Sequence, residues 1–371
     1  MHRREAPQRG DERGTRRAPD RRECAHDCRA SRSGTRVSPS SPSPRIVALG
    51  GGHGLAATLA AARELTSELT AIVTVADDGG SSGQIRREFD VLPPGDLRMA
   101  LAALAGSAPQ HSDMATLLQH RFGGRGALAG HPVGNLLLTG LVEVFGGDTV
   151  RALDVLCELI GAVGRVLPMS TIPLEITAWV EAVDGRNPLV GKLVRGQVAV
   201  ATTPGRVRSV HLVPEAPPVC EPAAAAIQAA DVVVLGPGSW FTSVLPHLLV
   251  PGLMSALELT SAHVIVVLNL EPQAGETEGF SPEEHLRVLR EHAPQLAVDT
   301  VVADASRVVD RRGLLNAVQA LRRDGRPEPR LVLRPVARTA DGDQHDPRRL
   351  AVALAHVIDG ATETEELPAW P

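Results

Sequence analysis

The stretch 46–55, IVALGGGHGL, joins a short apolar run to a run of glycines and then to a segment rich in Ala and Leu. Four consecutive apolar residues, 46–49, are typical of a parallel strand buried on both faces. The glycines at 50–54 precede a helix predicted over Leu55–Leu65, and loop amides at a helix start suit a phosphate. The spacing matches neither the dinucleotide fingerprint nor a P-loop. The stretch therefore predicts a strand, an anion-binding glycine loop and a helix, with His53 as either a ligand contact or a polar loop residue.

A second loop, 76–83, reads ADDGGSSG and follows the apolar run Thr70–Val75. Ligands bind at the carboxyl ends of parallel strands, so a binding loop is favoured here over a surface turn. Asp77 and Asp78 either hold a sugar or ribose hydroxyl or hold a magnesium ion, and the sequence leaves both roles open. We expect Asp78→Ala to weaken ligand affinity and to leave the fold intact.

The same pattern recurs at 232–249, where the apolar run Val232–Leu235 is followed by the loop GPGS and a predicted helix from Trp240 to Leu249. Two such loops at strand ends are predicted to face each other across one crevice and to bind a two-part ligand such as a nucleotide sugar. A third predicted strand, Val264–Leu268, ends at Asn269 in front of a polar loop.

Further polar residues interrupt apolar segments between these loops. In LPPGDLR, 92–98, Asp96 is a natural N-cap for a helix over 97–104, while the charge of Arg98 opposes the helix dipole and indicates an anion contact. Asn135 precedes a predicted helix and either caps it or contacts the ligand, and Arg165 lies in an apolar neighbourhood. The candidate ligand-binding residues are Gly51, Gly52, His53, Gly54, Asp77, Asp78, Gly79, Ser81, Ser82, Asp96, Arg98, Asn135, Arg165, Gly236, Pro237, Gly238, Ser239, Thr242, Ser243 and Asn269; none is assigned a catalytic role.

The domain organisation follows from where apolar periodicity starts and stops. Residues 1–44 are predicted to form a disordered extension, 45–360 one Rossmann-like α/β domain, and 361–371 a tail. The domain is expected to have a mostly parallel sheet with helices on both faces. A small inserted β region is predicted where Leu174–Val183 and Val207–Val213 alternate around the turn-rich stretch 184–205.

Composition excludes several classes of protein. The 371 residues carry a net charge of −5, which argues against a nucleic-acid partner, and no apolar run is long enough to span a membrane. Four scattered cysteines favour a cytoplasmic location, and Cys24, His26 and Cys28 lack a second ligand pair for zinc. The absence of Tyr excludes Tyr-dependent catalysis.

With these motifs in hand, the chain resembles the YvcK-like gluconeogenesis factor family, whose relatives include the 2-phospho-lactate transferases of coenzyme F420 synthesis. The resemblance covers about 45–358, and His53 stands where the family often has Thr. It implies a cytoplasmic Rossmann-like protein that binds UDP-sugars such as UDP-GlcNAc and links carbon supply to cell-wall synthesis and cell shape. It leaves room for a homodimer and an unidentified protein partner. The motifs that carry it are LGGGHGL (49–55), TVADDGGSSG (74–83), LPPGDLR (92–98), HPVGN (131–135), GRVLP (164–168), LGPGSWFTSVLPHLLVPG (235–252) and NLEPQAGETEG (269–279).

Two functions follow from these expectations, and we favour the first. A regulatory protein would bind the nucleotide sugar without turnover and require no cofactor. A transferase like the relatives would use magnesium at Asp77 and Asp78 to bridge a diphosphonucleoside substrate, because phosphoryl chemistry relies on positioning and charge neutralisation. A nicotinamide-dependent oxidoreductase is disfavoured, because the glycine loop lacks the fingerprint spacing.

Overall fold

A computed structural model describes residues 43–181, 191–273, 275–339 and 342–360. The predicted extension 1–44 lies outside the described residues except for its last two, and the predicted tail 361–371 lies outside them entirely.

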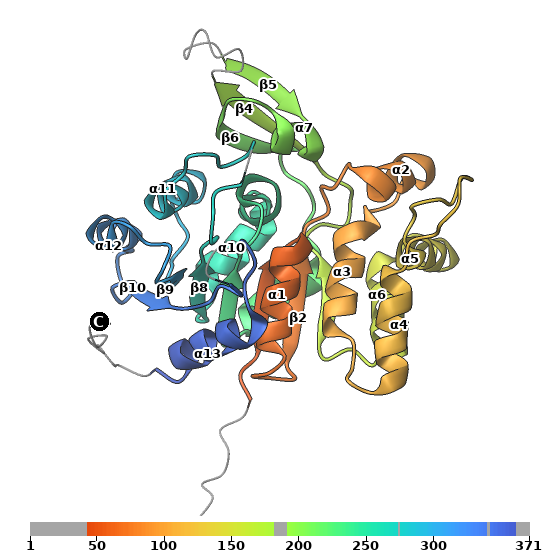
Figure 1. Cartoon of the computed structure of the whole chain (residues 1–371), viewed down its shortest axis with the longest axis horizontal. Helices are drawn as coiled ribbons and strands as arrows, with labels where there is room; N and C mark the ends of the chain where they lie inside the picture. Colours follow the sequence, from red (N-terminus) through yellow and green to blue (C-terminus); the bar gives the residue numbers. More distant parts are fainter. Residues whose placement is uncertain (1–42, 182–190, 274, 340–341, 361–371) are drawn as a thin grey trace, which may run out of the picture. The chain divides into compact units, whose positions relative to one another are not determined.

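Seven parallel strands form the main sheet, in the order β10-β9-β8-β7-β1-β2-β3 (Figure 1). This confirms the predicted parallel α/β architecture. From β1 the chain moves outward through β2 to β3, whereas β7 begins the other half of the sheet on the opposite side of β1. The strands are β1 (Ile46–Gly50), β2 (Leu69–Val73), β3 (Arg165–Pro168), β7 (Val232–Leu235), β8 (His263–Val267), β9 (Thr300–Asp304) and β10 (Arg330–Arg334).

The strand order reverses between β1 and β7, which lie side by side in the sheet. Chains that leave two adjacent parallel strands toward opposite sides open a crevice at the carboxyl ends, and this is where ligands bind in open α/β sheets. The loops that follow β1 and β7 are the two glycine loops identified in the sequence. Their position at this point is set by topology and not by local sequence.

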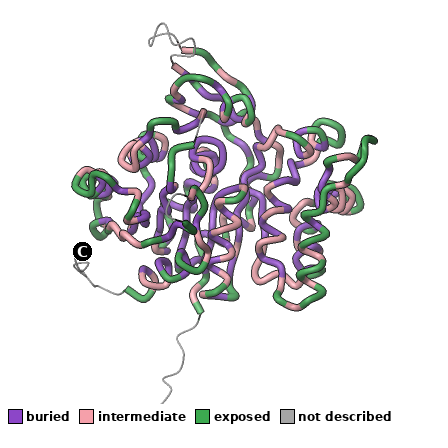
Figure 2. Tube along the Cα trace, in the orientation of Figure 1, coloured by how far each residue is buried: buried purple, intermediate pink, exposed green. Residues whose placement is uncertain are grey.

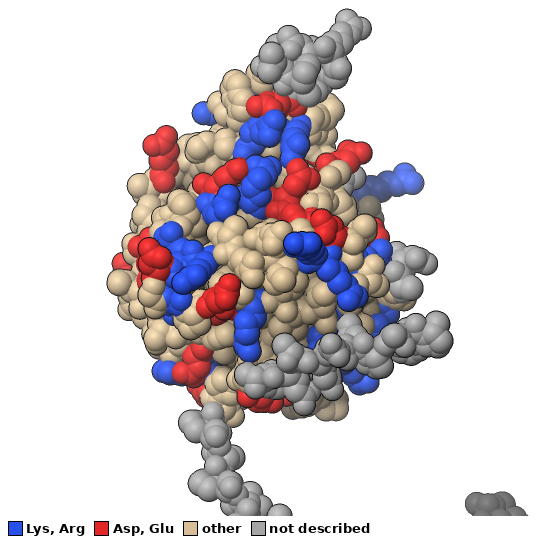
Figure 3. Space-filling model, turned by 90° about the vertical axis from the view of Figure 1, so that its left-hand side faces the viewer, with Lys and Arg blue, Asp and Glu red and all other residues tan. Residues whose placement is uncertain are grey.

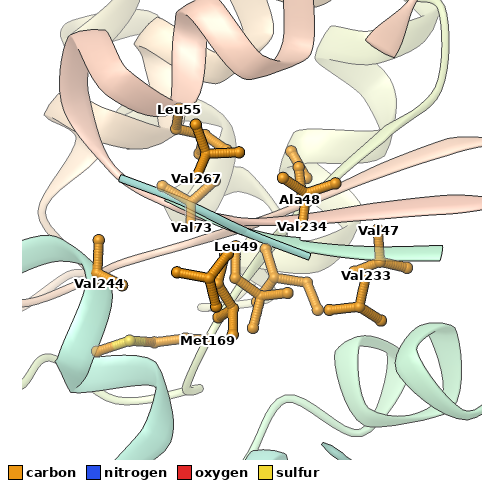
Figure 4. Close-up of a cluster of buried hydrophobic side chains, with 14 of the residues drawn as sticks. Val47, Ala48, Leu49, Leu55, Val73, Met169, Val233, Val234, Val244 and Val267 are labelled. Carbon is orange, nitrogen blue, oxygen red and sulfur yellow. The ribbon is translucent and has the colours of Figure 1, made fainter. Parts of the chain in front are cut away.

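The core surrounds the central strands, which are buried from end to end (Figure 2). Leu55 and Ala48 lie on one side of the sheet, and Leu49, Met169 and Val244 on the other (Figure 4). Apolar side chains that point alternately to both covered faces explain why these strands read as continuous apolar runs.

Helices surround the main sheet, and α1 packs against both α3 and α13. The helices are α1 (Gly52–Ala62), α2 (Gly80–Phe89), α3 (Pro94–Leu104), α4 (Pro109–Gln119), α5 (Val133–Val144), α6 (Thr149–Leu159), α8 (Glu221–Ala229), the π-helix η1 (Trp240–Val244), α9 (Leu245–Leu248), α10 (Pro251–Leu259), α11 (Pro282–His292), α12 (Arg311–Gln319) and α13 (Pro347–Ile358).

Three helix starts differ from the predictions. Helix α5 begins at Val133, so Asn135 lies inside its first turn and does not precede the helix. Helix α1 begins at Gly52, three residues earlier than predicted, so the glycines form its first turn. Helix α3 begins at Pro94 with Pro93 as its N-cap, and Asp96 is its third residue. The prediction that Asp96 caps this helix is therefore wrong, because a proline start places the carboxylate inside the first turn.

A three-stranded antiparallel sheet extends from the domain at the top of Figure 1, with β4 (Glu175–Glu181) between β5 (Gly191–Arg195) and β6 (Arg206–Val213). This confirms the inserted β region. The predicted turn-rich stretch 184–205 instead contains β5 and the short helix α7 (Gln197–Thr202). Its first part, 184–190, lies outside the described residues.

Within the described residues, no single helix has the length and apolar character needed to cross a membrane; one bent pair, Trp240–Leu248 with Pro251–Leu259, meets the criteria by length and composition alone. On the face shown in Figure 3, basic and acidic side chains are interspersed.

Candidate functional site

The two glycine loops touch each other directly. A Cβ atom at Gly54 would lie 2.2 Å from the Pro237 carbonyl oxygen and 2.7 Å from the Gly238 Cα, so only glycine permits this approach. The Thr58 hydroxyl also donates to the Gly236 carbonyl at 3.0 Å. The predicted crevice between the loops is therefore closed at this point, and any ligand must lie beside the contact.

The loop after β7 is filled by the protein's own groups. Glu276, which is 4% exposed, accepts hydrogen bonds from the Phe241 amide at 2.8 Å, the Thr242 amide at 2.9 Å and the Ser239 hydroxyl at 2.7 Å. Asn269 accepts from the Gly238 amide at 2.9 Å and donates to the Gly238 carbonyl at 2.8 Å. The amides at the start of η1 therefore already bond to a carboxyl group of the protein, that of Glu276, whose pKa is raised by burial against the lowering effect of these hydrogen bonds.

The loop after β1 has a carboxylate nearby that is much less firmly held. Gly51, the N-cap of α1, has no side chain with which to cap the helix, and Gly52 adopts a φ of +57°. Asp96 approaches from α3, since a Cβ at Gly51 would lie 2.6 Å from its Oδ2. Burial and the nearby Asp77 charge raise the pKa of Asp96 to about 7, against the lowering effect of the Gly52 amide and Arg98. Near neutral pH this carboxyl therefore titrates at the start of α1.

Asp77 and Asp78 are adjacent in sequence but are held in different environments. Asp77 accepts from the Gly79 amide at 2.9 Å and lies near Asp96, with which it interacts repulsively. Asp78 accepts from the Val198 amide at 3.0 Å, at the start of α7. The two carboxylates are thus directed to different partners, and the acidic pair at the site consists of Asp77 and Asp96.

A chain of hydrogen bonds joins α2, α3 and α5 beside this pair. Arg98 Nε donates to Asn135 Oδ1 at 3.0 Å, and Asn135 Nδ2 donates to Ser81 Oγ at 3.0 Å. Ser81 Oγ lies 2.9 Å from His131 Nδ1, and His131 Nε2 lies 3.2 Å from Gln84 Oε1. Asn135 is therefore a residue of α5 that connects Arg98 to Ser81, while Pro132 is the N-cap of that helix.

A pocket of about 1140 Å³ adjoins the start of α1. His53, Gly54, Pro237, Gly238 and Asn269 line one end of it, which brings five predicted residues to its wall. Small apolar side chains of α1, α3 and α4 also line it, and polar side chains from the C-terminal region complete the wall. These are Ala56, Ala57, Ala60, Ala102, Ala103 and Ala115, with Arg338, Gln344 and His345.

Most remaining predicted residues lie at or near these loops, but Arg165 does not. It is the first residue of β3, at the amino end of the strand, and binds Asp154 through two hydrogen bonds of 2.7 Å. We therefore correct its assignment to an ion pair between β3 and α6. Ser82 Oγ and Asp77 Oδ2 both lie close to Gly95, and Ser243 Oγ lies close to Gly51. The Ser239 and Thr242 hydroxyls bond to each other.

Sequence reasoning missed four residues of this region. Thr74, His131 and Glu276 lie inside the quoted motifs, so motif membership was the available signal for them. Thr74 places its methyl group beside Gly51, and its hydroxyl is buried without a hydrogen-bond partner among the described residues. Arg338 lines the pocket from a segment far along the chain, and no local pattern distinguishes it.

Comparisons with known proteins agree with the observed fold. Residues 46–324 match the family model described as "2-phospho-L-lactate transferase CofD". A protein of Mycobacterium tuberculosis named as a gluconeogenesis factor is 55% identical over 331 residues, covering 87% of this chain and 95% of its own. The gluconeogenesis factor of Halalkalibacterium halodurans is 36% identical, covering 71% and 79%. The crystal structure of a UPF0052 family member from Bacillus halodurans has a TM-score of 0.74 at 30% identity, covering 85% and 99%.

Proposed function

Because the chain belongs to the CofD family and to the group of proteins named gluconeogenesis factors, we propose that it is a regulatory protein that binds a nucleotide diphosphate sugar, such as UDP-GlcNAc. In this proposal, ligand binding links carbon metabolism to cell-wall synthesis and cell shape. The observation that carries it is the start of α1, whose N-cap is a glycine, where the carboxyl group of Asp96 bonds to the Gly52 amide, and which adjoins a pocket of about 1140 Å³.

The start of α1 supports a diphosphate in three ways. Backbone amides at a helix N-terminus and the helix dipole favour an anion. Of the glycines in this turn, Gly52 has free space beside it, since a Cβ there would meet no atom nearer than 4.0 Å. The acidic proton of Asp96, held near neutral pH, is available to a phosphate oxygen, or the carboxylate accepts from a sugar hydroxyl once it is ionised.

The pocket beside α1 supports the nucleoside half of the ligand. Its volume of about 1140 Å³ is slightly larger than most small-molecule sites, so a nucleotide has room there. Alanines of α1 and α3 form an apolar wall for a flat base, and Arg338 and Gln344 supply polar groups at its edge. The sugar half would then lie on the other side of Gly51, toward Asp96 and Asp77.

A magnesium-dependent transferase is the second candidate, favoured by the closeness of Asp77 and Asp96. Among the described residues, no group of three or more His, Cys, Asp or Glu side chains could hold a metal by itself. Two carboxylates suit an Mg²⁺ ion that also binds phosphate oxygens of the ligand. Such an ion would neutralise charge on the diphosphate. Asp77 would then share it with Asp96, since Asp78 is bound to the Val198 amide.

Calorimetry with UDP-GlcNAc, with and without Mg²⁺, followed by chromatography of the same mixtures, separates the two candidates. Binding that leaves the nucleotide intact supports the regulatory protein. Release of a nucleotide product supports the transferase and overturns the regulatory proposal. Absence of binding by any uridine or guanosine diphosphate sugar would contradict both.

The cytoplasmic location, the absence of a nucleic-acid partner, and a homodimer or unidentified protein partner stay predictions. Size measurement of the purified protein with and without UDP-GlcNAc tests the oligomeric state.

A further inference from the structure

Arg98 is a buried cation for which the described part of the chain offers no ion-pair partner. Its side chain belongs to a residue that is 5% exposed, and none of the six ion pairs found among the described residues involves it. It is the fifth residue of α3, beyond the first turn. Burial without a counterion, and not the helix dipole, is therefore what makes this guanidinium unusual, because an unpaired buried charge is costly.

The surroundings of Arg98 do not remove this cost. Burial and the nearby Arg121 charge lower the pKa of Arg98 to about 10, so the guanidinium carries its charge at neutral pH. Asp96 opposes this lowering, but the pKa of Asp96 is itself raised to about 7. The guanidinium charge of Arg98 thus has no ion-pair partner within contact distance among the described residues.

The hydrogen-bond chain fixes Arg98 and leaves its outer nitrogens available. Gln84 Oε1 can only accept, so His131 donates to it through Nε2 and accepts from the Ser81 hydroxyl through Nδ1. Asn135 donates to Ser81 and accepts from Arg98 Nε. Each member is satisfied, whereas the two terminal nitrogens of Arg98 have no acceptor within the described residues. Neither of these nitrogens is among the fully buried side-chain atoms that have no hydrogen-bond partner in the described part of the chain.

We propose that Arg98 binds an acidic group on the sugar half of the ligand, a carboxylate or a further phosphate, as a subsite separate from the diphosphate site at α1. This inference rests on the proposed function. The start of α2, which has no capping side chain, lies beside it through Ser81, the second residue of that helix. Ser82 Oγ and Asp77 Oδ2 both lie close to Gly95, three residues before Arg98, so the acidic pair of Asp77 and Asp96 lies next to this subsite.

The ligand class follows from this arrangement. A neutral sugar leaves the Arg98 charge unpaired after binding, whereas an acid-bearing sugar neutralises it through a charge-assisted, planar contact. The structure therefore favours nucleotide diphosphate sugars that carry an acidic group over neutral ones. Asn135, Ser81 and His131 are positioning residues in this proposal, since they act through Arg98.

UDP-glucuronate and UDP-glucose form a matched pair for the test, because they differ only at C6, which is a carboxylate in the first and a hydroxymethyl group in the second. We expect wild-type protein to bind UDP-glucuronate about tenfold more tightly in calorimetry, the effect of one charge-assisted contact. In Arg98→Gln we expect the affinity for UDP-glucuronate to fall to that for UDP-glucose. Arg98→Lys keeps a positive charge and should retain part of the difference. Arg87→Gln, an exposed position on α2, serves as the control and keeps the wild-type ratio.

Thermal unfolding without ligand separates this role from a structural one. Arg98→Gln keeps an amide that can bond Asn135 and removes an unpaired buried charge, so its Tm is expected to equal or exceed that of wild type. A large fall in Tm, equal wild-type affinities for both ligands, or equal weakening of both by Arg98→Gln would overturn the proposal. If wild-type protein binds neither ligand nor any other nucleotide sugar, the proposed function fails first and this inference fails with it.

Discussion

The loops after β1 and β7 have the same local arrangement of strand, glycines and helix but differ in how the helix start is occupied. Each follows a buried strand, contains glycines and opens a helix, and each has a carboxylate at that helix start. Glu276 accepts hydrogen bonds from two amides and a hydroxyl at the start of η1. Asp96 lies at the start of α1, where the charge of Asp77 repels its ionised form. The comparison teaches that two glycine loops with the same local arrangement can differ in how far the protein's own groups satisfy the helix start.

The largest expected effect tests whether the two loops must touch. In Gly54→Ala the new methyl group meets the Pro237 and Gly238 backbone, so we expect a loss of about 3 kcal/mol of unfolding free energy. Gly140→Ala on α5, where a Cβ meets nothing within 4 Å, should instead gain roughly 0.5 to 1 kcal/mol. Urea titration of both variants measures this. Equal stability of the two would show that the loops can separate at little cost.

The second prediction concerns the filled loop. Glu276→Ala leaves the Phe241 and Thr242 amides and the Ser239 hydroxyl without their acceptor, at a cost of about 2 to 3 kcal/mol. Glu276→Gln keeps one acceptor oxygen and should lose less than half of that. Both are measured by chemical unfolding at pH 7. If Glu276→Ala is as stable as wild type and binds UDP-GlcNAc more tightly, the β7 loop is a ligand site and the contrast drawn above is false.

The third prediction uses pH to test the open loop. The folded pKa of Asp96, about 7, lies above its ordinary value of 3.8, so the folded state holds the proton more tightly. Wild-type stability therefore falls as pH rises from about 4 to about 7, because the unfolded chain releases that proton first. Asp96→Asn has no carboxyl group to ionise and so does not lose this stability. Its free energy of unfolding should exceed that of wild type by on the order of 2 kcal/mol at pH 8 and differ little from it at pH 4.

The same variant should lose UDP-GlcNAc affinity, since the residue lies at the proposed diphosphate site. Thermal unfolding across pH 4 to 8, with calorimetry at pH 7, supplies both readouts. A stability difference that does not change with pH would remove Asp96 as the titrating group.

The smallest expected effect extends the comparison to the neighbouring aspartates. Asp78→Ala should cost about 1 kcal/mol through loss of the Val198 contact, with little change in ligand affinity. This revises the expectation drawn from sequence alone. Asp77→Asn should weaken binding and lower the pKa of Asp96, because one repelling charge is gone. Carboxyl NMR titration and calorimetry measure these effects, and a larger affinity loss in Asp78→Ala than in Asp77→Asn would reverse the two roles.

Local sequence predicted β1, β2, β7 and β8 to within two residues, because a strand covered on both faces must be apolar throughout, but it did not predict β3 or β5. Val232–Leu235 is the clearest case, predicted and observed with the same bounds. Helix starts were predicted less well, because glycine and proline obscure the first turn: α1 begins within its glycines and α3 begins at Pro94. The loops at the ends of β1, β2 and β7 were placed at one edge because parallel strands end together.

Side-chain partners could not be predicted, because they come from distant segments. Arg165 has an apolar neighbourhood in sequence and an acid on α6 in space, while Asn135 joins Arg98 and Ser81 across three helices. Glu276 lies some 40 residues from the strand whose loop it fills, counted from β7 at Val232–Leu235. Spacing within a motif carries no information about such contacts.

The sequence by itself determined that this chain forms a parallel α/β sheet with glycine loops at its strand ends, because burial and backbone freedom are local requirements. Tertiary structure decided which of those loops is open. That choice depends on charges brought together from separate elements: Glu276 satisfies one helix start, and Asp77 and Asp96 repel each other at the other. Electrostatic energy depends on distance in space, which is set only when the sheet has assembled.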